Sequence, residues 1–257
     1  MSILVNLKGK YACFTMPEFN TERVSYPVIT PSSARNILDR IYWHPGVLWV
    51  IDRIYVCAPI RYMGFTTNEV STKGASHLVL QEALITGSPL YLDADFSHTP
   101  RHSLVLKNVT YVVEAHIEII EKLLDKNNSP EKINRMAMRR LQGGQQYRDL
   151  YFGKREFAAY YKLLDDETCI PEIPAENLGV RDFGYMLFDI DRSNRDKDGN
   201  RINKAHLTNR PMFYKAVMVD GCIDVPHPKS KDVKYHEYND EHEHENSGKK
   251  EESEVLF

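Results

Sequence analysis

The sequence has few cysteines, no long apolar run and no net positive charge. Its four cysteines, Cys13, Cys57, Cys169 and Cys222, lie far apart and form no CxxC pair. This spacing is typical of reduced thiols in a cytoplasmic protein, and not of a disulfide framework or a zinc site. No run of 18 apolar residues occurs and no basic flank precedes an apolar stretch at the N-terminus, so we expect a cytoplasmic protein without a membrane span or signal peptide.

Common catalytic and metal-binding motifs are missing as well. There is no glycine-rich P-loop, no GxSxG and no HExxH. Residues 194–199 imitate the start of a calcium-binding loop, but the twelfth position is Ala205 and not a glutamate, so a polar hairpin turn is the better interpretation. The histidines of the acidic C-terminal tail, His236, His242 and His244, are explained by a flexible tail. We therefore expect no metal and no cofactor.

The net charge of −3 hides an uneven distribution. Residues 227–257 contain five Lys and nine Asp or Glu, which leaves 28 basic and 27 acidic residues, a charge of +1, on the rest of the chain. Within 132–155 one acid, Asp149, accompanies seven basic residues: Lys132, Arg135, Arg139, Arg140, Arg148, Lys154 and Arg155. Local potential attracts a phosphate backbone, although a solvated helix face is an equally good reading of such a run.

Hydrophobic periodicity predicts a β-α-β-β-α-β order. We expect strands over 3–14, 47–60, 111–119 and 155–164, with helices starting at Pro31 and Pro130 after the capping residues Thr30 and Ser129. This order is the ferredoxin-like pattern, which RNA-recognition modules also use. The fold class is therefore α+β, with a long insertion over 61–103 that contains a short helix near 78–85.

Three further strands are expected after residue 169, over 184–191, 211–219 and 222–225. Asp220-Gly221 between the last two is a hairpin signal. We predict a ferredoxin-like RNA-binding domain over 1–168, a small antiparallel sheet over 169–226, and a disordered acidic tail over 227–257.

Two side chains are candidates for acid–base chemistry. His116 stands on the polar face of the third strand between Glu114 and Glu118, which would favour its protonated form. Tyr42 lies at the end of the first helix, where it can anchor its ring and present its hydroxyl. In a ferredoxin-like fold the first helix and the third strand both pack on one central sheet, so Tyr42 and His116 could come close. For each there is a plainer alternative: a salt-bridged surface histidine and a core tyrosine.

The basic segment 132–155 also carries Gly143-Gly144 and the aromatic residues Tyr147, Tyr151 and Phe152. Arginines with interleaved aromatics and a glycine turn suit phosphate contact and base stacking. No helix-turn-helix or zinc-finger pattern appears, so the segment favours RNA or a single strand over the reading of a duplex groove.

Several phrases of the sequence resemble one protein family in their order. They begin with segments 11–15 (YACFT), 22–26 (ERVSY), 31–35 (PSSAR), 41–45 (IYWHP) and 50–54 (VIDRI). Further on come 68–70 (NEV), 111–116 (YVVEAH), 153–157 (GKREF), 184–187 (GYML), 216–218 (AVM) and 220–221 (DG). Together they resemble the CRISPR-associated Cas-five family of the RAMP superfamily, subtype I-C ("d" variant), over residues 8–226.

The resemblance implies an endoribonuclease that cleaves precursor CRISPR RNA at the repeat hairpin and keeps the 5′ handle. It also implies a place in the Cascade complex beside the backbone and large subunits. The family site of a tyrosine, a lysine and a histidine maps to Tyr42 and His116, but the lysine has no match, because Glu114 and Ala115 occupy the positions before His116. Lys107, Lys154 or Arg155 could fill the cationic role instead. Metal-independent attack by the 2′-hydroxyl is the implied chemistry.

Two alternatives stay open from the sequence. The chain could be a non-catalytic subunit that only grips the 5′ handle, as the missing lysine suggests. It could also bind double-stranded DNA, since a basic surface attracts either duplex.

Overall fold

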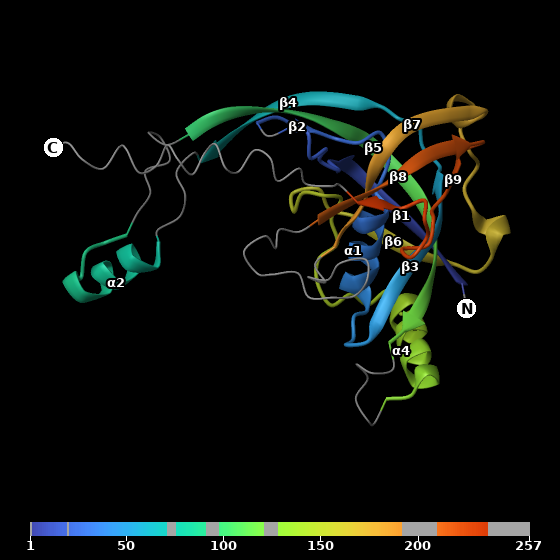
Figure 1. Cartoon of the computed structure of the whole chain (residues 1–257), viewed down its shortest axis with the longest axis horizontal. Coiled ribbons are helices and arrows are strands. Elements are labelled where there is room, and N and C mark those ends of the chain that lie inside the picture. The colour runs from blue at the N-terminus through green and yellow to red at the C-terminus, as the bar shows by residue number, and fades with distance from the viewer. Residues whose placement is uncertain are drawn as a thin grey trace.

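A computed structural model describes residues 2–19, 21–70, 76–90, 98–120, 128–191 and 210–235. These parts of the chain form a mixed α/β structure, in which one large and mainly antiparallel sheet carries few helices (Figure 1). Among the described helices, each is too short or too polar to cross a bilayer.

The centre of the sheet is β5 (His98–Ile119), which is flanked by β1 (Ser2–Ala12) and β3 (Val47–Val56). β6 (Tyr160–Leu164) pairs with the far side of β1, which gives the order β3-β5-β1-β6 with all pairs antiparallel. Alternate residues of these strands are buried and apolar, and they form the floor of the core.

Two capped helices pack on this apolar floor. α1 (Pro31–Ile41) starts at Thr30, whose hydroxyl accepts the backbone N–H of Ser33 at 3.3 Å. α4 (Pro130–Gln142) starts at Ser129 in the same way. Each helix has proline in its first turn, as predicted. The residues that the two helices bury are Ala34, Ile37, Leu38 and Ile41 from α1, and Ile133, Ala137 and Leu141 from α4.

The long insertion extends the sheet as an arm. β4 (Tyr62–Val70) pairs with the first half of β5, and β2 (Arg23–Val24) runs parallel to β5 beside it. The predicted short helix is α2 (His77–Thr86), which stands apart from the sheet (Figure 1). β5 is thus much longer than the predicted 111–119, because its first half finds a partner in the insertion.

The C-terminal strands do not form a sheet of their own, so that expectation is wrong. β7 (Val180–Asp191), β8 (Arg210–Val219), β9 (Cys222–Asp224) and β10 (Lys234–Tyr235) join the main sheet, because β9 pairs with the edge of β3. The hairpin signal itself is confirmed: Asp220 and Gly221 have φ values of 48° and 78°, as a tight hairpin turn requires. Two 3-10 helices, η2 (Glu167–Cys169) and η3 (Ala175–Asn177), lie in the connection before β7.

Candidate active site

His116 is held by a carboxylate that the sequence analysis did not single out. Its Nδ1 lies 2.8 Å from Oδ2 of Asp52, and both side chains are about one-third exposed. A carboxylate only accepts hydrogen bonds, so Nδ1 carries the hydrogen and Nε2 is the nitrogen left for a reaction. Within the described residues Nε2 has no hydrogen-bond partner. This arrangement fixes the tautomer and the direction of a proton-transfer group.

A β-bulge in β3 brings Asp52 to His116. Ile51 pairs with Ala115 and Arg53 pairs with Glu114, so Asp52 between them is the extra residue of the bulge. The backbone carbonyl of Asp52 accepts the N–H of Val225 at 2.9 Å, which holds the bulge in place. Bulges commonly re-aim side chains next to active sites, and this one turns a carboxylate toward the imidazole.

The two glutamates beside His116 are engaged with other partners. Glu114 accepts the Ser2 hydroxyl at 3.0 Å and lies 3.5 Å from Arg53. Glu118 lies 2.8 Å from Nε2 of His227, and this hydrogen bond, followed by the positive charges of Lys229 and His116, holds the pKa of Glu118 below its ordinary value. Asp52 is therefore the direct partner of His116, whereas the sequence pointed to the glutamates.

Tyr42 lies on the other face of the sheet from His116. Its backbone carbonyl accepts Nε1–H of Trp49, which pairs with Ile117 on the core face of β5, while His116 points the opposite way. Its ring packs under the guanidinium of Arg140 at 5.5 Å, and burial raises the pKa of its hydroxyl. The expected approach of Tyr42 to His116 is therefore not formed, because helices pack on the apolar face that His116 avoids.

The cations of the basic segment differ in their exposure to solvent. The exposed cations are Lys132, Arg135, Arg139, Arg148 and Arg155. Lys154 instead lies 3.8 Å from Glu69, where the arm meets the body. Gly143 caps α4 and Gly144 follows with a φ of 64°. Of the three aromatic candidates for base stacking, Phe152 is fully buried and Tyr147 is the most exposed.

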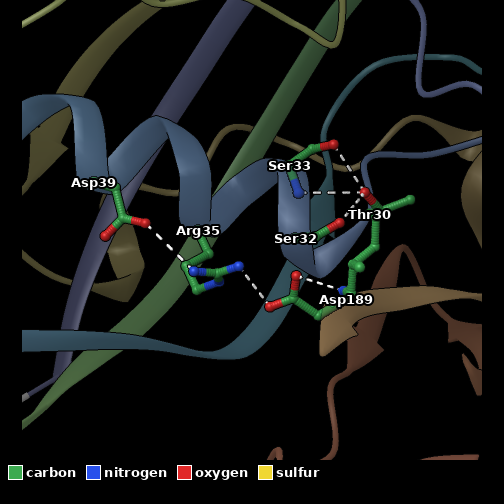
Figure 2. A network of polar contacts seen from close by, with 7 residues as sticks. Thr30, Ser32, Ser33, Arg35, Asp39 and Asp189 are labelled. Atoms are coloured by element: carbon green, nitrogen blue, oxygen red, sulfur yellow. Dashed lines mark hydrogen bonds and ion pairs between the residues drawn. The ribbon is translucent and has the colours of Figure 1, made fainter. Parts of the chain in front are cut away.

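A groove of about 630 Å³ runs between α1, the edge of β3 and β7. Its charged residues are Arg35, Asp39 and Asp189, and Arg35 lies 3.5 Å from Asp39 and 2.6 Å from Asp189 (Figure 2). Val50, another lining residue, is the cross-strand partner of His116. The groove therefore lies one strand away from the imidazole. No pattern in the sequence predicts this groove, because its walls come from segments more than 100 residues apart.

The carboxyl of Asp39 in this groove has an unusually high pKa for an aspartate. Burial raises the pKa of its carboxyl to about 6, the charge of Asp189 adds to the rise, and Arg35 opposes it. A carboxyl with a raised pKa destabilises the folded protein once it ionises. Its side chain is 23% exposed, so solvent relieves only part of this effect.

Asp39→Asn is expected to raise the free energy of unfolding at pH 7 by about 1–3 kcal/mol. The folded wild-type chain holds the Asp39 proton more strongly than the unfolded chain, so its stability relative to the variant falls as the pH rises from about 4 to about 6. Urea unfolding of both proteins between pH 4 and 8 measures this. A stability difference that stays constant over the range would contradict the assignment.

Metal-ligating clusters are absent from the described part of the chain, where no three His, Cys, Asp or Glu side chains gather suitably. Residues 194–205, which resemble a calcium-binding loop, and the histidines of the C-terminal tail lie outside the described residues. The described site thus offers one oriented histidine, a carboxylate behind it, and a groove beside it.

Two solved structures share the fold of this chain. One is titled "Crystal Structure of CRISPR-associated Protein", with a TM-score of 0.60 and 20% identity over 91% of this chain and 96% of the other. The second is a functionally uncharacterized protein from Streptococcus mutans, with a TM-score of 0.60 and 21% identity over 91% and 97% of the two chains. At this identity the likeness concerns the fold alone.

Sequence comparison is more specific. Two relatives are both named CRISPR pre-crRNA endoribonuclease Cas5d. The one from Mannheimia succiniciproducens is 38% identical over 90% of this chain and 98% of its own length, and the one from Thermus thermophilus is 33% identical over 89% and 93%. The profile of a family described as CRISPR-associated protein (Cas_Cas5) matches residues 2–226. The chain belongs to the Cas5d family of CRISPR-associated proteins.

Proposed function

We propose that the chain is an endoribonuclease that cleaves precursor CRISPR RNA at the repeat hairpin. Two relatives that match it over about nine-tenths of its length are named for this activity. The observation that carries the proposal in this chain is the hydrogen bond between His116 and Asp52, because it orients an imidazole as acid–base catalysis requires.

The reaction follows from the chemistry of RNA. The ribose 2′-oxygen attacks the adjacent phosphorus in line, the bond from phosphorus to the 5′-oxygen breaks, and a 2′,3′-cyclic phosphate and a 5′-hydroxyl form. Nε2 of His116 donates the proton that the leaving 5′-oxygen takes up, and the 2′-hydroxyl proton passes to solvent. Asp52 stabilises the ring while it is protonated. Such a step needs no metal ion.

The exposed cations of the 132–155 segment supply the contact with RNA. α4 packs on the face of the sheet opposite His116, so these cations would meet RNA beyond the scissile phosphate. We assign them to holding the hairpin and then the 5′ handle, with Tyr147 as the residue for base stacking. Residues 1–168, whose strand order β3-β5-β1-β6 fits a ferredoxin-like domain, carry this RNA-binding role, and residues 169–226 extend the sheet.

The same proposal gives the chain its partners. After cleavage it retains the guide RNA and sits in a cytoplasmic Cascade complex of type I-C with the backbone and large subunits. A non-catalytic subunit that only grips the handle is the second candidate, and the unmatched lysine together with the separation of Tyr42 from His116 favours it. Nothing in the described surface singles out double-stranded DNA.

The purified chain is expected to cut a repeat hairpin at one bond in the presence of EDTA. A matched hairpin with a 2′-deoxy sugar at the scissile nucleotide is expected to bind equally well and stay intact, because the nucleophile is missing. Gel analysis of end-labelled strands, with phosphatase treatment to detect the cyclic phosphate, measures both. Binding of the ribose hairpin without cleavage would support the handle-gripping subunit instead.

A further inference from the structure

The groove between α1, the edge of β3 and β7 is a feature that the proposed reaction does not use. Its volume of about 630 Å³ falls in the range typical of small-molecule pockets. Its lining combines apolar and aromatic side chains with serine, asparagine and charged groups in similar measure. The apolar and aromatic ones include Pro31, Trp49, Tyr151, Phe188, Met212 and Pro228.

The charge of the groove excludes a phosphate as its occupant. One arginine faces two aspartates, so the lining is negative when both carboxyls are ionised. Arg35 is already paired within the protein, because its two terminal nitrogens contact Asp39 and Asp189. A ligand that fits must therefore offer hydrogen-bond donors and not negative charge.

Asp39 is the acceptor that such a donor would meet. Its Oδ2 lies at the long distance of 3.5 Å from Arg35, and within the described residues its Oδ1 has no partner. In Figure 2 this second oxygen points away from Arg35. Asp189, in contrast, uses one oxygen for Arg35 and the other for the backbone N–H of Ile190 at 2.8 Å. Burial is the main cause of the raised pKa of Asp39, and the charge of Arg35 opposes it only in part.

We propose that this groove binds a guanine base of the guide RNA precursor, with the Asp39 carboxylate accepting N1–H and the N2 amino group of its Watson–Crick edge. Guanine presents these two donors side by side, and a carboxylate takes such a pair in a bidentate way. Asn36, which also lines the groove, offers an amide to its O6. The inference rests on the proposed function, since it takes RNA as the ligand.

The position of the groove indicates what a bound base would do. Val50 lies both in the groove wall and opposite His116 across the β3–β5 pair. A base held there would lie at the edge of β3, the strand next to the one that carries His116, and unstacked bases in protein pockets are a common way to recognise single-stranded RNA. The bound guanine would thus set the register in which the repeat passes this edge of the sheet.

Short oligoribonucleotides test the inference on the full chain. Fluorescence anisotropy at pH 8 compares UUGUU with UUAUU, UUCUU and UUUUU, and with UUIUU, in which inosine lacks the N2 amino group. We expect UUGUU to bind about 10- to 100-fold more tightly than the other standard bases, as a bidentate contact provides, and inosine to lose most of this preference.

Two variants locate the preference. Asp39→Asn is expected to abolish it, so that this variant binds UUGUU and UUUUU with equal affinity. Asp165→Asn, which removes the same charge from an exposed residue outside the groove, is expected to keep it. Equal affinity for all oligonucleotides, or a guanine preference that survives Asp39→Asn, would overturn the inference.

The two proposals fail separately in these experiments. If the chain prefers guanine through Asp39 but cuts no hairpin, the base-binding site is supported and the nuclease activity is contradicted. If the chain cuts the hairpin without any guanine preference, the nuclease activity is supported and the base-binding site is contradicted.

Discussion

Replacement of His116 by alanine is expected to slow cleavage of the repeat hairpin by about 10²–10⁴-fold, the range in which a positioned acid–base group contributes. Hairpin affinity should change no more than a few-fold, because the exposed cations lie elsewhere and His116 is only part-buried. Single-turnover cleavage with saturating protein separates the chemical step from binding. A variant that cuts at the wild-type rate would remove His116 from the mechanism.

Asp52 provides a stricter version of this experiment. It acts through His116 and is therefore a positioning residue, so Asp52→Asn should slow cleavage less than the loss of the imidazole does. In the His116→Ala background the same change should cost nothing further, since groups that work as a unit are not additive. If Asp52 only stabilised the bulge, its effect would persist in that background. The double-mutant cycle distinguishes these outcomes.

Tyr42→Phe is the matched control for the chemistry. The Tyr42 hydroxyl is buried without a partner among the described residues, so its removal leaves no orphaned group behind. A wild-type cleavage rate would agree with its place on the far face of the sheet. A loss as large as that of His116→Ala would mean that RNA binding rearranges the sheet and α1.

The core elements could be predicted from the sequence because each of them depends on residues that are neighbours in the chain. Thr30 and Ser129 cap the two helices, and alternation assigns His116 to the polar face of β5. That same alternation already implied the separation from Tyr42, since an amphipathic helix packs on the apolar face. The expectation that they could come close came from the packing of the first helix and the third strand on one sheet, which does not take account of the face on which each side chain lies.

What the sequence could not show depends on contacts between distant segments. Asp52 reaches His116 through a bulge, and the register shift behind it appears only when β3 is paired with β5. The joining of the C-terminal strands to the main sheet depends on β9 finding the open edge of β3. The groove needs α1, β3 and β7 together. The one local sign of Asp52 was the interruption of an apolar strand by Asp52-Arg53.

Gly153→Ala is expected to lower the free energy of unfolding by about 3–5 kcal/mol, which is among the largest effects of single substitutions. Gly153 has a φ of 78°, which an L side chain rarely adopts, and an added Cβ would lie 1.8 Å from the backbone carbonyl oxygen of Cys13. The loop cannot move away freely, because the N–H of Cys13 bonds to the carbonyl of Phe152 at 3.1 Å. Phe152 in turn is fully buried against Phe14 and Tyr111.

Gly144→Ala separates the strain of the backbone from the clash. Gly144 has a similar φ of 64° but no atom within 4 Å of an added Cβ, so alanine there costs only the left-handed conformation, about 1–2 kcal/mol. Urea unfolding of the two variants and the wild type measures their free energies of unfolding. The difference between the two losses is the cost of the clash. Equal losses would show that the 150–158 loop yields without breaking its bond to Cys13. Because Gly153 also lines the groove, a large difference would mean that the wall beside Asp39 is held by this close backbone packing.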